Sequence, residues 1–246
     1  MDLSTRHPPM TVVLLDPYHL GDPLFVSQLA RDVAARGAGS QSEGLVLVHG
    51  SGEAGERALE ARGAAPVAHG GVWAVASADE AAEVERATRD LNRRLVHEMN
   101  EAGVPAVRVM ASDRGLVARG PDGALRAGRT GWLATLATQG GVALVAALVA
   151  AEPGRGEALA EVDASEAAAV LAEALGAEAV VLLATGRIVA SDGALSLREA
   201  TAMVPDRGLA ERLIGHLSGT SRVPVRLAAV AQLRVPGAVA GMRLVA

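Results

Sequence analysis

The sequence predicts an α/β protein in which an open, mainly parallel sheet lies between layers of helices, a three-layer sandwich. Short runs rich in Val and Leu alternate along the chain with longer stretches in which apolar residues recur at helical spacing. Half of the 246 residues are hydrophobic and only 2% are aromatic, so Ala, Val and Leu have to build the core. The 51 alanines favour helices packed closely against a Val-rich sheet.

Strands are predicted where Val and Leu form short uninterrupted runs, as expected for strands buried on both faces. In chain order these runs are residues 11–15, 45–49, 104–110, 142–149, 179–183 and 223–231, with a last strand ending at residue 245. Asp16 and Pro17 end the first run, because proline lacks the backbone N–H that a strand needs.

Helices are predicted where apolar residues recur every three or four positions. In chain order these stretches are residues 23–35, 53–62, 79–101, 132–139, 164–175 and 208–217. Gly103 and Gly176 follow two of them and are expected to end those helices. A hairpin is expected between residues 115–118 and 124–127, and a loop at residues 152–157.

The chain shows no internal repeat and no low-complexity linker, so residues 1–246 are expected to form one domain with two lobes. The first ten residues contain charged residues and two prolines rather than an apolar targeting segment. The most hydrophobic run, residues 142–151, is about half the length that spans a bilayer. We therefore expect a cytoplasmic protein without a membrane partner.

The charged residues exclude several classes of function. All 23 basic residues are arginine, which excludes a lysine Schiff base, a pyridoxal phosphate anchor and a P-loop lysine. The 28 acidic residues give a net charge of -5, so nucleic acid is not an expected partner. The chain has no cysteine, which excludes a disulfide, a zinc-thiolate site and a thiol nucleophile.

The turn between the second strand and the next helix, Gly50, Ser51 and Gly52, is the most informative local feature. Backbone N–H groups at such a turn can bind an anion, and the helix dipole contributes about 1 kcal/mol. The alternative is a tight turn that needs glycine only for its backbone angles. The residues alone leave both interpretations open.

Three segments together resemble the amino acid kinase family and, within it, the N-acetylglutamate kinase branch. Residues 47–52 are similar to the family's Val-His-Gly-Gly-Gly turn, and residues 91–96 to its Val-Asn-Lys helix motif. Residues 163–183 resemble its Asn-Ala-Asp helix and the strand that follows. The resemblance covers about residues 10–189, and the rest of the chain matches by topology. It implies the amino acid kinase fold, with a substrate lobe at about 1–150 and a nucleotide lobe at about 151–246.

The resemblance implies transfer of the γ-phosphoryl group of ATP to the carboxylate of an acylated amino acid, in arginine-type or lysine-type biosynthesis. ATP and Mg²⁺ are the implied cofactors if the protein is active, and a small carboxylate and a nucleotide are the implied partners. The implied substrate-binding or phosphate-binding residues are Gly50, Ser51, Gly52, Asn92 and Asp163. The implied nucleotide-binding residues are Thr185, Gly186 and Arg207.

Some of these residues also have structural interpretations. Asp163 precedes the helix at 164–175 and is expected to cap it. Asn92 is expected either to bind a ligand or to bond a neighbouring backbone group. Arg207 lies near the position of the family's second catalytic lysine, although a planar guanidinium is not equivalent to an ammonium.

The sequence departs from the family at positions that carry chemistry. Leu14 stands where the family has a catalytic lysine, Ser165 where it has the acidic organiser, and Trp73 where it has the arginine that binds the substrate carboxylate. Catalytic residues and metal ligands are therefore not assigned.

Three functions stay open: a kinase in which arginines replace lysines, a pseudokinase acting as a regulatory or oligomer-forming subunit, and a small-molecule-binding or storage protein. The helix at 79–101 resembles the element through which acetylglutamate kinases dimerise, so we predict a homodimer.

Overall fold

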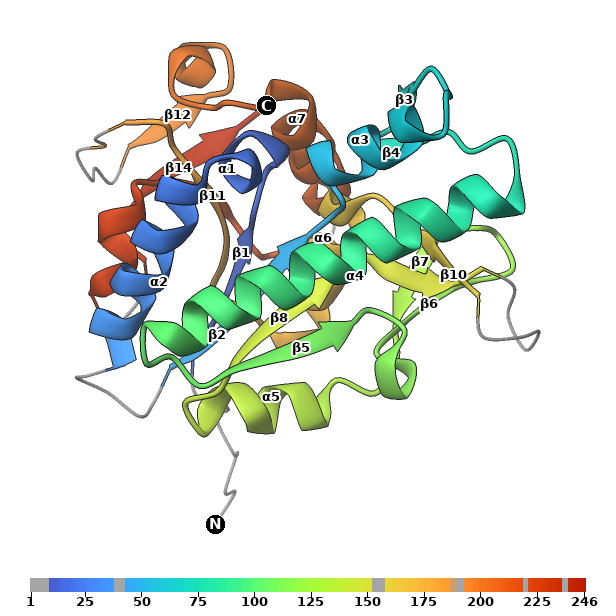
Figure 1. Ribbon diagram of the computed structural model, residues 1–246. Coiled ribbons are helices and arrows are strands. Elements are labelled where there is room, and N and C mark those ends of the chain that lie inside the picture. The colour runs from blue at the N-terminus through green and yellow to red at the C-terminus, as the bar shows by residue number, and fades with distance from the viewer. Residues whose placement is uncertain are drawn as a thin grey trace.

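A sheet of eight strands forms the centre of the molecule (Figure 1). The computed structural model describes residues 9–37, 43–151, 158–186, 188, 193–218, 221–235 and 239–246. The spatial order of the strands is β12-β14-β13-β11-β1-β2-β8-β5. Their bounds are β1 (Met10–Leu14), β2 (Gly44–His49), β5 (Ala106–Met110), β8 (Val142–Ala146), β11 (Ala179–Leu183), β12 (Ala194–Ser196), β13 (Val225–Ala228) and β14 (Met242–Val245). The strands from β13 to β5 are parallel, and β14 runs antiparallel to β13.

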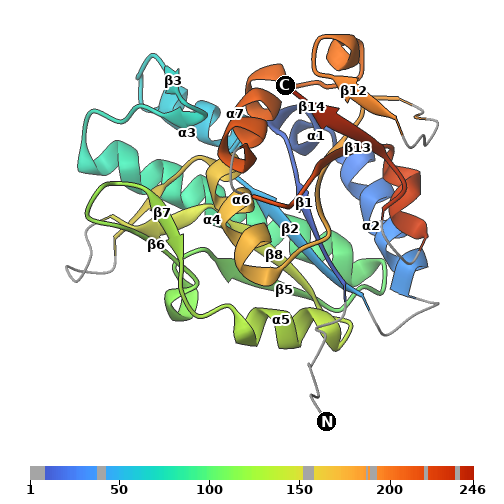
Figure 2. The same ribbon diagram turned by 180° about the vertical axis from the view of Figure 1, so that it is seen from behind.

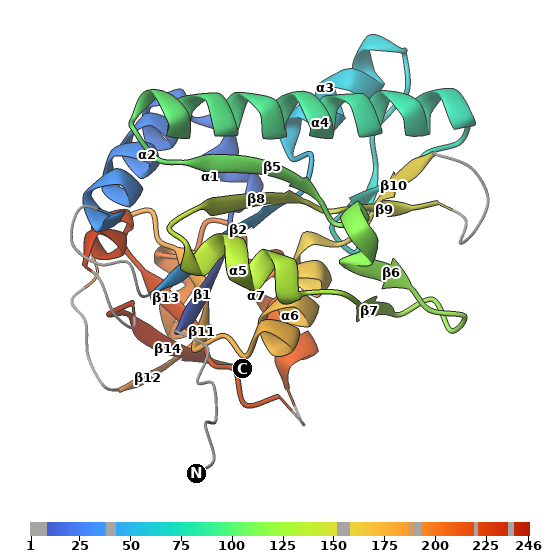
Figure 3. The same ribbon diagram turned by 90° about the horizontal axis from the view of Figure 1, so that it is seen from below.

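Helices cover both faces of the sheet, which confirms the predicted α/β fold of three layers. Helices α2 and α4 lie on one face, and α5, α6 and α7 lie on the other (Figure 3). The helix bounds are α1 (Pro17–Gly21), α2 (Pro23–Gly37), α3 (Glu53–Ala61), α4 (Ala78–Glu101), α5 (Gly131–Thr138), α6 (Ala164–Leu175) and α7 (Arg207–Leu217), with short 3-10 helices η1 (Asp113–Gly115), η2 (Glu199–Ala202) and η3 (Val230–Arg234).

The central strands are buried on both faces because their residues alternate between the two helical layers. On β1, Val12 belongs to the core on the side of α6, whereas Val13 belongs to the core on the side of α2 and α4. Val46 and Leu47 on β2 divide in the same way. This double burial explains why the strands read as continuous apolar runs in the sequence.

Short polar side chains set the ends of the main helices. The Ser77 hydroxyl accepts the N–H of Glu80 and begins α4, and the Asp163 carboxylate accepts the N–H of Ser165 and begins α6. Gly176 ends α6 with a φ of 61°, a conformation that glycine adopts without strain.

Two predicted strands are shorter than expected. The run at 142–149 divides into β8 and β9 (Leu148–Ala150), because Ala147 N–H bonds the His49 carbonyl and the chain then leaves the sheet to pair with β10 (Leu159–Glu161). The run at 223–231 ends with β13, and η3 follows because the Gln232 side chain accepts the Ala229 N–H. The loop predicted at 152–157 lies outside the described residues.

Of the small elements outside the main sheet, one hairpin was predicted from the sequence, and another hairpin and a short helix were not. The hairpin of β3 (Ala68–His69) and β4 (Val72–Trp73) was not predicted, and neither was the single-turn helix α1. The predicted hairpin at 115–127 is present as β6 (Val117–Arg119) and β7 (Leu125–Ala127).

The C-terminal ends of β1 and β2 point toward α1, α3 and α7, which gather at the upper end of the sheet (Figures 1 and 2). Strands β1 and β11 are neighbours in the sheet, and the chain continues from β1 to β2 on one side and from β11 to β12 and β13 on the other. Ligands of open α/β sheets bind at such a point, beyond the carboxyl ends of the strands. Among the described residues, no helix combines the length and apolar character needed to cross a bilayer.

Candidate functional site

A cavity of about 370 Å³ opens at the C-terminal ends of β1 and β2. The turn of Gly50, Ser51 and Gly52 forms one wall, and the β3–β4 hairpin and α7 contribute others. Leu15 and Trp73 supply part of its apolar surface. Its size is within the range of pockets that hold small molecules.

The Glu161 carboxylate binds the glycine turn. The backbone N–H of Ser51 donates to Oε1 of Glu161, and Ser51 Oγ donates to Oε2 at 3.0 Å. A methyl group added to Gly50 would lie 2.9 Å from Oε1, so the carboxylate packs directly on the turn. Burial raises the Glu161 pKa to about 7, the bonds from Ser51 oppose this rise, and the charge of Asp163 adds to it. The Ser51 N–H, one of the donors that could bind an external anion, is thus already bonded to a carboxyl group of the protein itself.

Asp163 combines the predicted helix cap with an ion pair. Its Oδ1 accepts the N–H of Ser165 at 3.0 Å, and its Oδ2 accepts bonds from Ser165 Oγ at 2.7 Å and Arg212 Nε at 2.9 Å. His216 Nε2 lies 3.7 Å from the same oxygen. Burial raises the Asp163 pKa, but His216, Ser165 and Arg212 outweigh burial and the net shift is downward. Asp163 therefore stays ionised and neutralises Arg212.

Asn92 supports the turn from behind and does not line the cavity. Its Nδ2 donates to Nε2 of His49 at 2.8 Å and to the Leu144 carbonyl at 2.9 Å. The Nδ1 of His49 bonds the Gly50 carbonyl at 2.8 Å. Burial lowers the His49 pKa to about 4, so the imidazole is neutral and can accept from Asn92 while it donates to Gly50. Both side chains are fully buried and hold the turn in place.

Trp73 fixes the other end of the turn. Its Nε1 donates to the Gly52 carbonyl at 3.2 Å. Gly52 has a φ of 53°, which a residue with a side chain adopts only with strain. Gly52 is therefore required by the turn geometry, which supports the backbone interpretation at this position.

The implied nucleotide-binding residues do not line this cavity. Thr185 and Gly186 follow β11, and the N–H of Thr185 donates to the Met203 carbonyl at 3.1 Å. Arg207 is exposed at the start of α7 and pairs with Glu211 at 2.7 Å. The structure thus brings Gly50, Ser51, Gly52 and Asp163 together at the cavity and leaves Asn92, Thr185, Gly186 and Arg207 outside it.

Five carboxylates and one guanidinium line the cavity among the described residues. They are Glu53, Glu56, Glu161, Asp163, Asp206 and Arg212. The sequence reasoning singled out Asp163 and missed the others. The position of Glu161, two residues before Asp163 and so on the same side of an extended segment, is the signal that could have identified it. The sequence has no comparable signal for Arg212, because it reaches the site from a distant helix.

Two contacts at the turn disfavour binding of the phosphate chain of ATP. Phosphate binding needs free N–H donors and uncompensated cations, whereas Glu161 bonds Ser51 and Asp163 neutralises Arg212. Leu14, at the position of the family's lysine, is fully buried in the core. In the described ranges, no group of three or more acidic or histidine side chains is arranged to hold a metal ion.

Solved structures with this fold come from several enzymes. The N-acetylglutamate synthase of Neisseria gonorrhoeae, in complex with coenzyme A and N-acetyl-glutamate, superposes with a TM-score of 0.67 at 20% identity, over 98% of this chain and 60% of that chain. An isopentenyl phosphate kinase matches with a TM-score of 0.61 at 15% identity, over 96% of this chain and 100% of that one. A Giardia carbamate kinase matches with a TM-score of 0.58 at 12% identity, over 97% and 99% of the two chains.

The TM-scores establish a shared fold, and at these low sequence identities they establish the fold alone. The chain spans about 60% of the length of the N-acetylglutamate synthase that it matches. No protein of curated function was matched by the sequence. The sequence profile described as the amino acid kinase family matches residues 19–189, well over half of the chain. The chain therefore belongs to the amino acid kinase family.

Proposed function

We propose that this chain is a non-catalytic member of the amino acid kinase family that binds a small molecule in the cavity above Gly50–Gly52. The bonds from Ser51 to the Glu161 carboxyl group carry this proposal, because they place an acidic side chain of the protein where a phosphate oxygen would bind. Such a protein serves as a regulatory or ligand-binding subunit.

Electrostatics support the loss of catalysis. Phosphoryl transfer depends on positioned cations that stabilise the charge on the transferred group. Leu14 replaces the first family lysine, and Arg207 near the second pairs with Glu211 at the surface. Removing one preorganised electrostatic partner costs about 3 to 4 kcal/mol, or several hundredfold in rate, so these combined losses leave little activity.

The second candidate is a kinase resembling N-acetylglutamate kinase, with ATP and Mg²⁺ as cofactors. The family match and the likeness to kinase structures favour it. It requires the Ser51–Glu161 contact to open and a cation to approach the turn.

A coupled ADP-release assay separates the two candidates. The full chain is incubated with ATP, Mg²⁺ and N-acetylglutamate, and binding of ATP and Mg²⁺ is followed by calorimetry in parallel. We expect no ADP release above the rate without acceptor. Release of ADP in proportion to phosphorylated N-acetylglutamate would overturn the non-catalytic proposal.

A further inference from the structure

We propose that the cavity binds a small cationic molecule, an amine or a guanidine, rather than an anionic one. This inference rests on the proposed ligand-binding function and specifies the chemistry of its ligand. It follows from the charge of the cavity wall, from the carboxylates that remain free to bind, and from the aromatic side chain beside them.

The wall carries far more negative than positive groups. Its one guanidinium among the described residues, Arg212, is 2.9 Å from Asp163 and is compensated by it. The carboxylates of Glu53, Glu56 and Asp206 remain on the same wall, whereas the Glu161 carboxyl group is already bonded by Ser51. In a partly enclosed site the field of these groups is less screened than at an open surface. It attracts a cation and repels a carboxylate or phosphate.

Several of these carboxylate oxygens are available to a ligand. Glu56 is half-buried and makes no hydrogen bond or ion pair with any described residue. Asp206 uses Oδ1 to accept the Leu209 N–H at the start of α7, and Oδ2 makes no bond to the described part of the chain. Glu53 pairs with Arg57 at 3.2 Å, but both side chains are more than half exposed, so this pair is weak.

The apolar part of the wall also suits an alkyl amine. Trp73 lines the cavity with Leu15 and Leu20, and its bond to Gly52 fixes the indole in place. An indole ring attracts ammonium and guanidinium groups, most strongly where they are shielded from water. Trp73 and the carboxylates come from different elements of the fold, and both favour a cation.

An anion at the turn would meet two obstacles. It would have to displace Glu161 from Ser51, and it would then lie beside the ionised Asp163. Like charges brought together in a partly desolvated site disfavour binding strongly. The side chains that exclude phosphate from the turn are thus the same ones that favour a cationic ligand.

Probes that share a four-carbon skeleton test the sign of the charge directly. Calorimetry on the full chain compares putrescine, 1,4-butanediol and succinate, with agmatine as the guanidine probe. We expect putrescine or agmatine to bind, the neutral diol to bind at least about tenfold more weakly, and succinate not to bind. The affinity for the cation should fall as the salt concentration rises.

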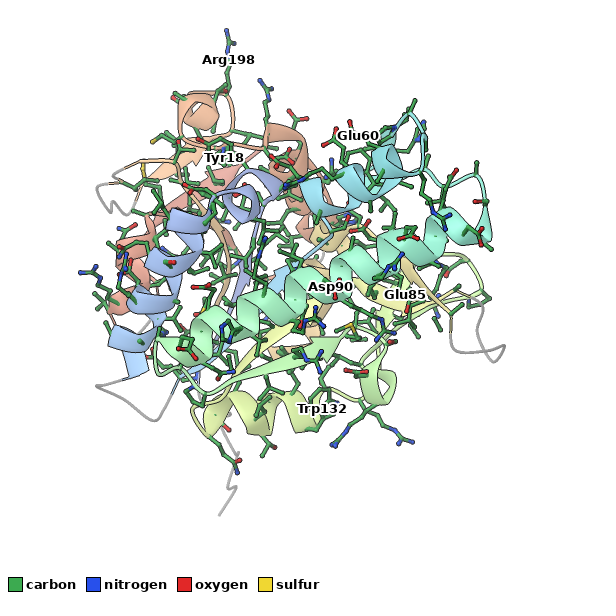
Figure 4. The ribbon with its side chains drawn as sticks, in the orientation of Figure 1. Tyr18, Glu60, Glu85, Asp90, Trp132 and Arg198 are labelled. Atoms are coloured by element: carbon green, nitrogen blue, oxygen red, sulfur yellow. The ribbon has the colours of Figure 1, made fainter. Side chains whose placement is uncertain are left out.

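Two substitutions on α3 locate the binding to the cavity. Glu56→Gln removes a carboxylate from the wall and should weaken putrescine or agmatine binding about tenfold. Glu60→Gln makes the same change on the exposed surface of α3, where Glu60 is labelled in Figure 4, and should leave the affinity within about twofold. Both variants should show the unfolding temperature of the unmodified chain, which confirms that they fold.

The outcomes separate this inference from the proposal on which it rests. Binding of succinate in preference to the cations, absence of cation binding, or equal weakening by Glu56→Gln and Glu60→Gln would each overturn the cationic ligand. None of those binding results is evidence for kinase activity, so the non-catalytic function would still stand. ADP release in the coupled assay would instead overturn the non-catalytic function itself.

Discussion

The buried Glu161 carboxyl makes the stability of this protein depend on pH. Its pKa is raised to about 7 from an ordinary value of 4.5, mainly by burial. A group whose pKa is raised on folding stabilises the fold most below its unfolded pKa. That stabilisation is lost as the pH rises through the folded pKa, because the unfolded chain releases the proton first.

Glu161→Gln should remove this pH dependence while keeping an oxygen that accepts the Ser51 N–H. Relative to the variant, the unmodified chain should lose about 3 kcal/mol of unfolding free energy as the pH rises from about 4.5 to about 8. Urea unfolding of both proteins across this range measures the difference. His49, whose pKa is lowered to about 4, is present in both and cancels in the comparison. Parallel curves would show that the carboxyl titrates normally.

Sequence reasoning at this scale succeeded for Asp163, which caps α6 as expected from its place before an alanine-rich helix. For Asn92 it left two roles open, and the structure shows a bond to the backbone carbonyl of Leu144, which is 52 residues away in the chain. It failed for Glu161 and Arg212, whose partners are distant in the sequence. The contact of Arg212 depends on tertiary packing, which residue spacing does not encode, whereas the two-residue spacing of Glu161 and Asp163 could have placed both on one side of the chain.

Helix α2 and the 3-10 helix η3 are joined by a buried charge. Asp32 is fully buried, and its Oδ1 accepts from Arg234 Nε and from Gln28 Nε2. Arg36, one turn further along α2, donates to the Val235 carbonyl at 2.8 Å. These bonds hold η3, which follows β13, against helix α2.

Arg234→Ala should destabilise the fold, because it leaves the Asp32 carboxylate buried without its cation. A loss of about 2 kcal/mol in unfolding free energy is expected, less than for a fully buried pair because Arg234 is half exposed. Adding Asp32→Leu should recover part of the loss, since the unpaired charge is then gone. Urea unfolding of the single and double variants checks this. If the losses of unfolding free energy from Arg234→Ala and Asp32→Leu simply add, the unpaired Asp32 charge is not the cause of the destabilisation.

Elements with a strong periodic pattern were the predictable ones. The central strands and α4 appear within a few residues of their predicted bounds, because double burial and an amphipathic face leave long patterns. The division of β8 from β9 was not predictable from the apolar run, which continues through the bend at Ala147. The β3–β4 hairpin has two residues in each strand, β3 exposed and β4 half-buried, so it is too short to show an apolar pattern.

For the whole molecule, the sequence predicted the three-layer fold and the family but not the acidic character of the cavity. Assembly stays a prediction, with α4 as the contact helix. Its outer face is charged and largely paired within the helix, with Arg89 at 2.8 Å from Glu85 and Arg93 at 3.1 Å from Asp90. Glu85 and Asp90 are labelled on α4 in Figure 4. An interface built on this face would be polar.

The predicted homodimer should therefore be sensitive to salt. We expect a dimer at low ionic strength and a monomer at about 1 M salt, where the Debye length is about 3 Å. Asp90→Arg should weaken the dimer by adding positive charge to the face, whereas Glu173→Arg, exposed on α6, should not. Light scattering measures the mass in each case. A monomer under all conditions would contradict the prediction.

The contact between β10 and the glycine turn also fixes the number of residues in the segment that joins β10 to α6. Glu161 and Asp163 lie on one side of an extended segment, while Val162 between them is buried in the core. Inserting or deleting a single residue here would exchange the two sides, because side chains of an extended chain alternate. Valine would then face the cavity, and a carboxylate would enter the apolar layer beneath α6. Relatives with a closed turn are thus expected to conserve the spacing of this segment as strictly as its residues.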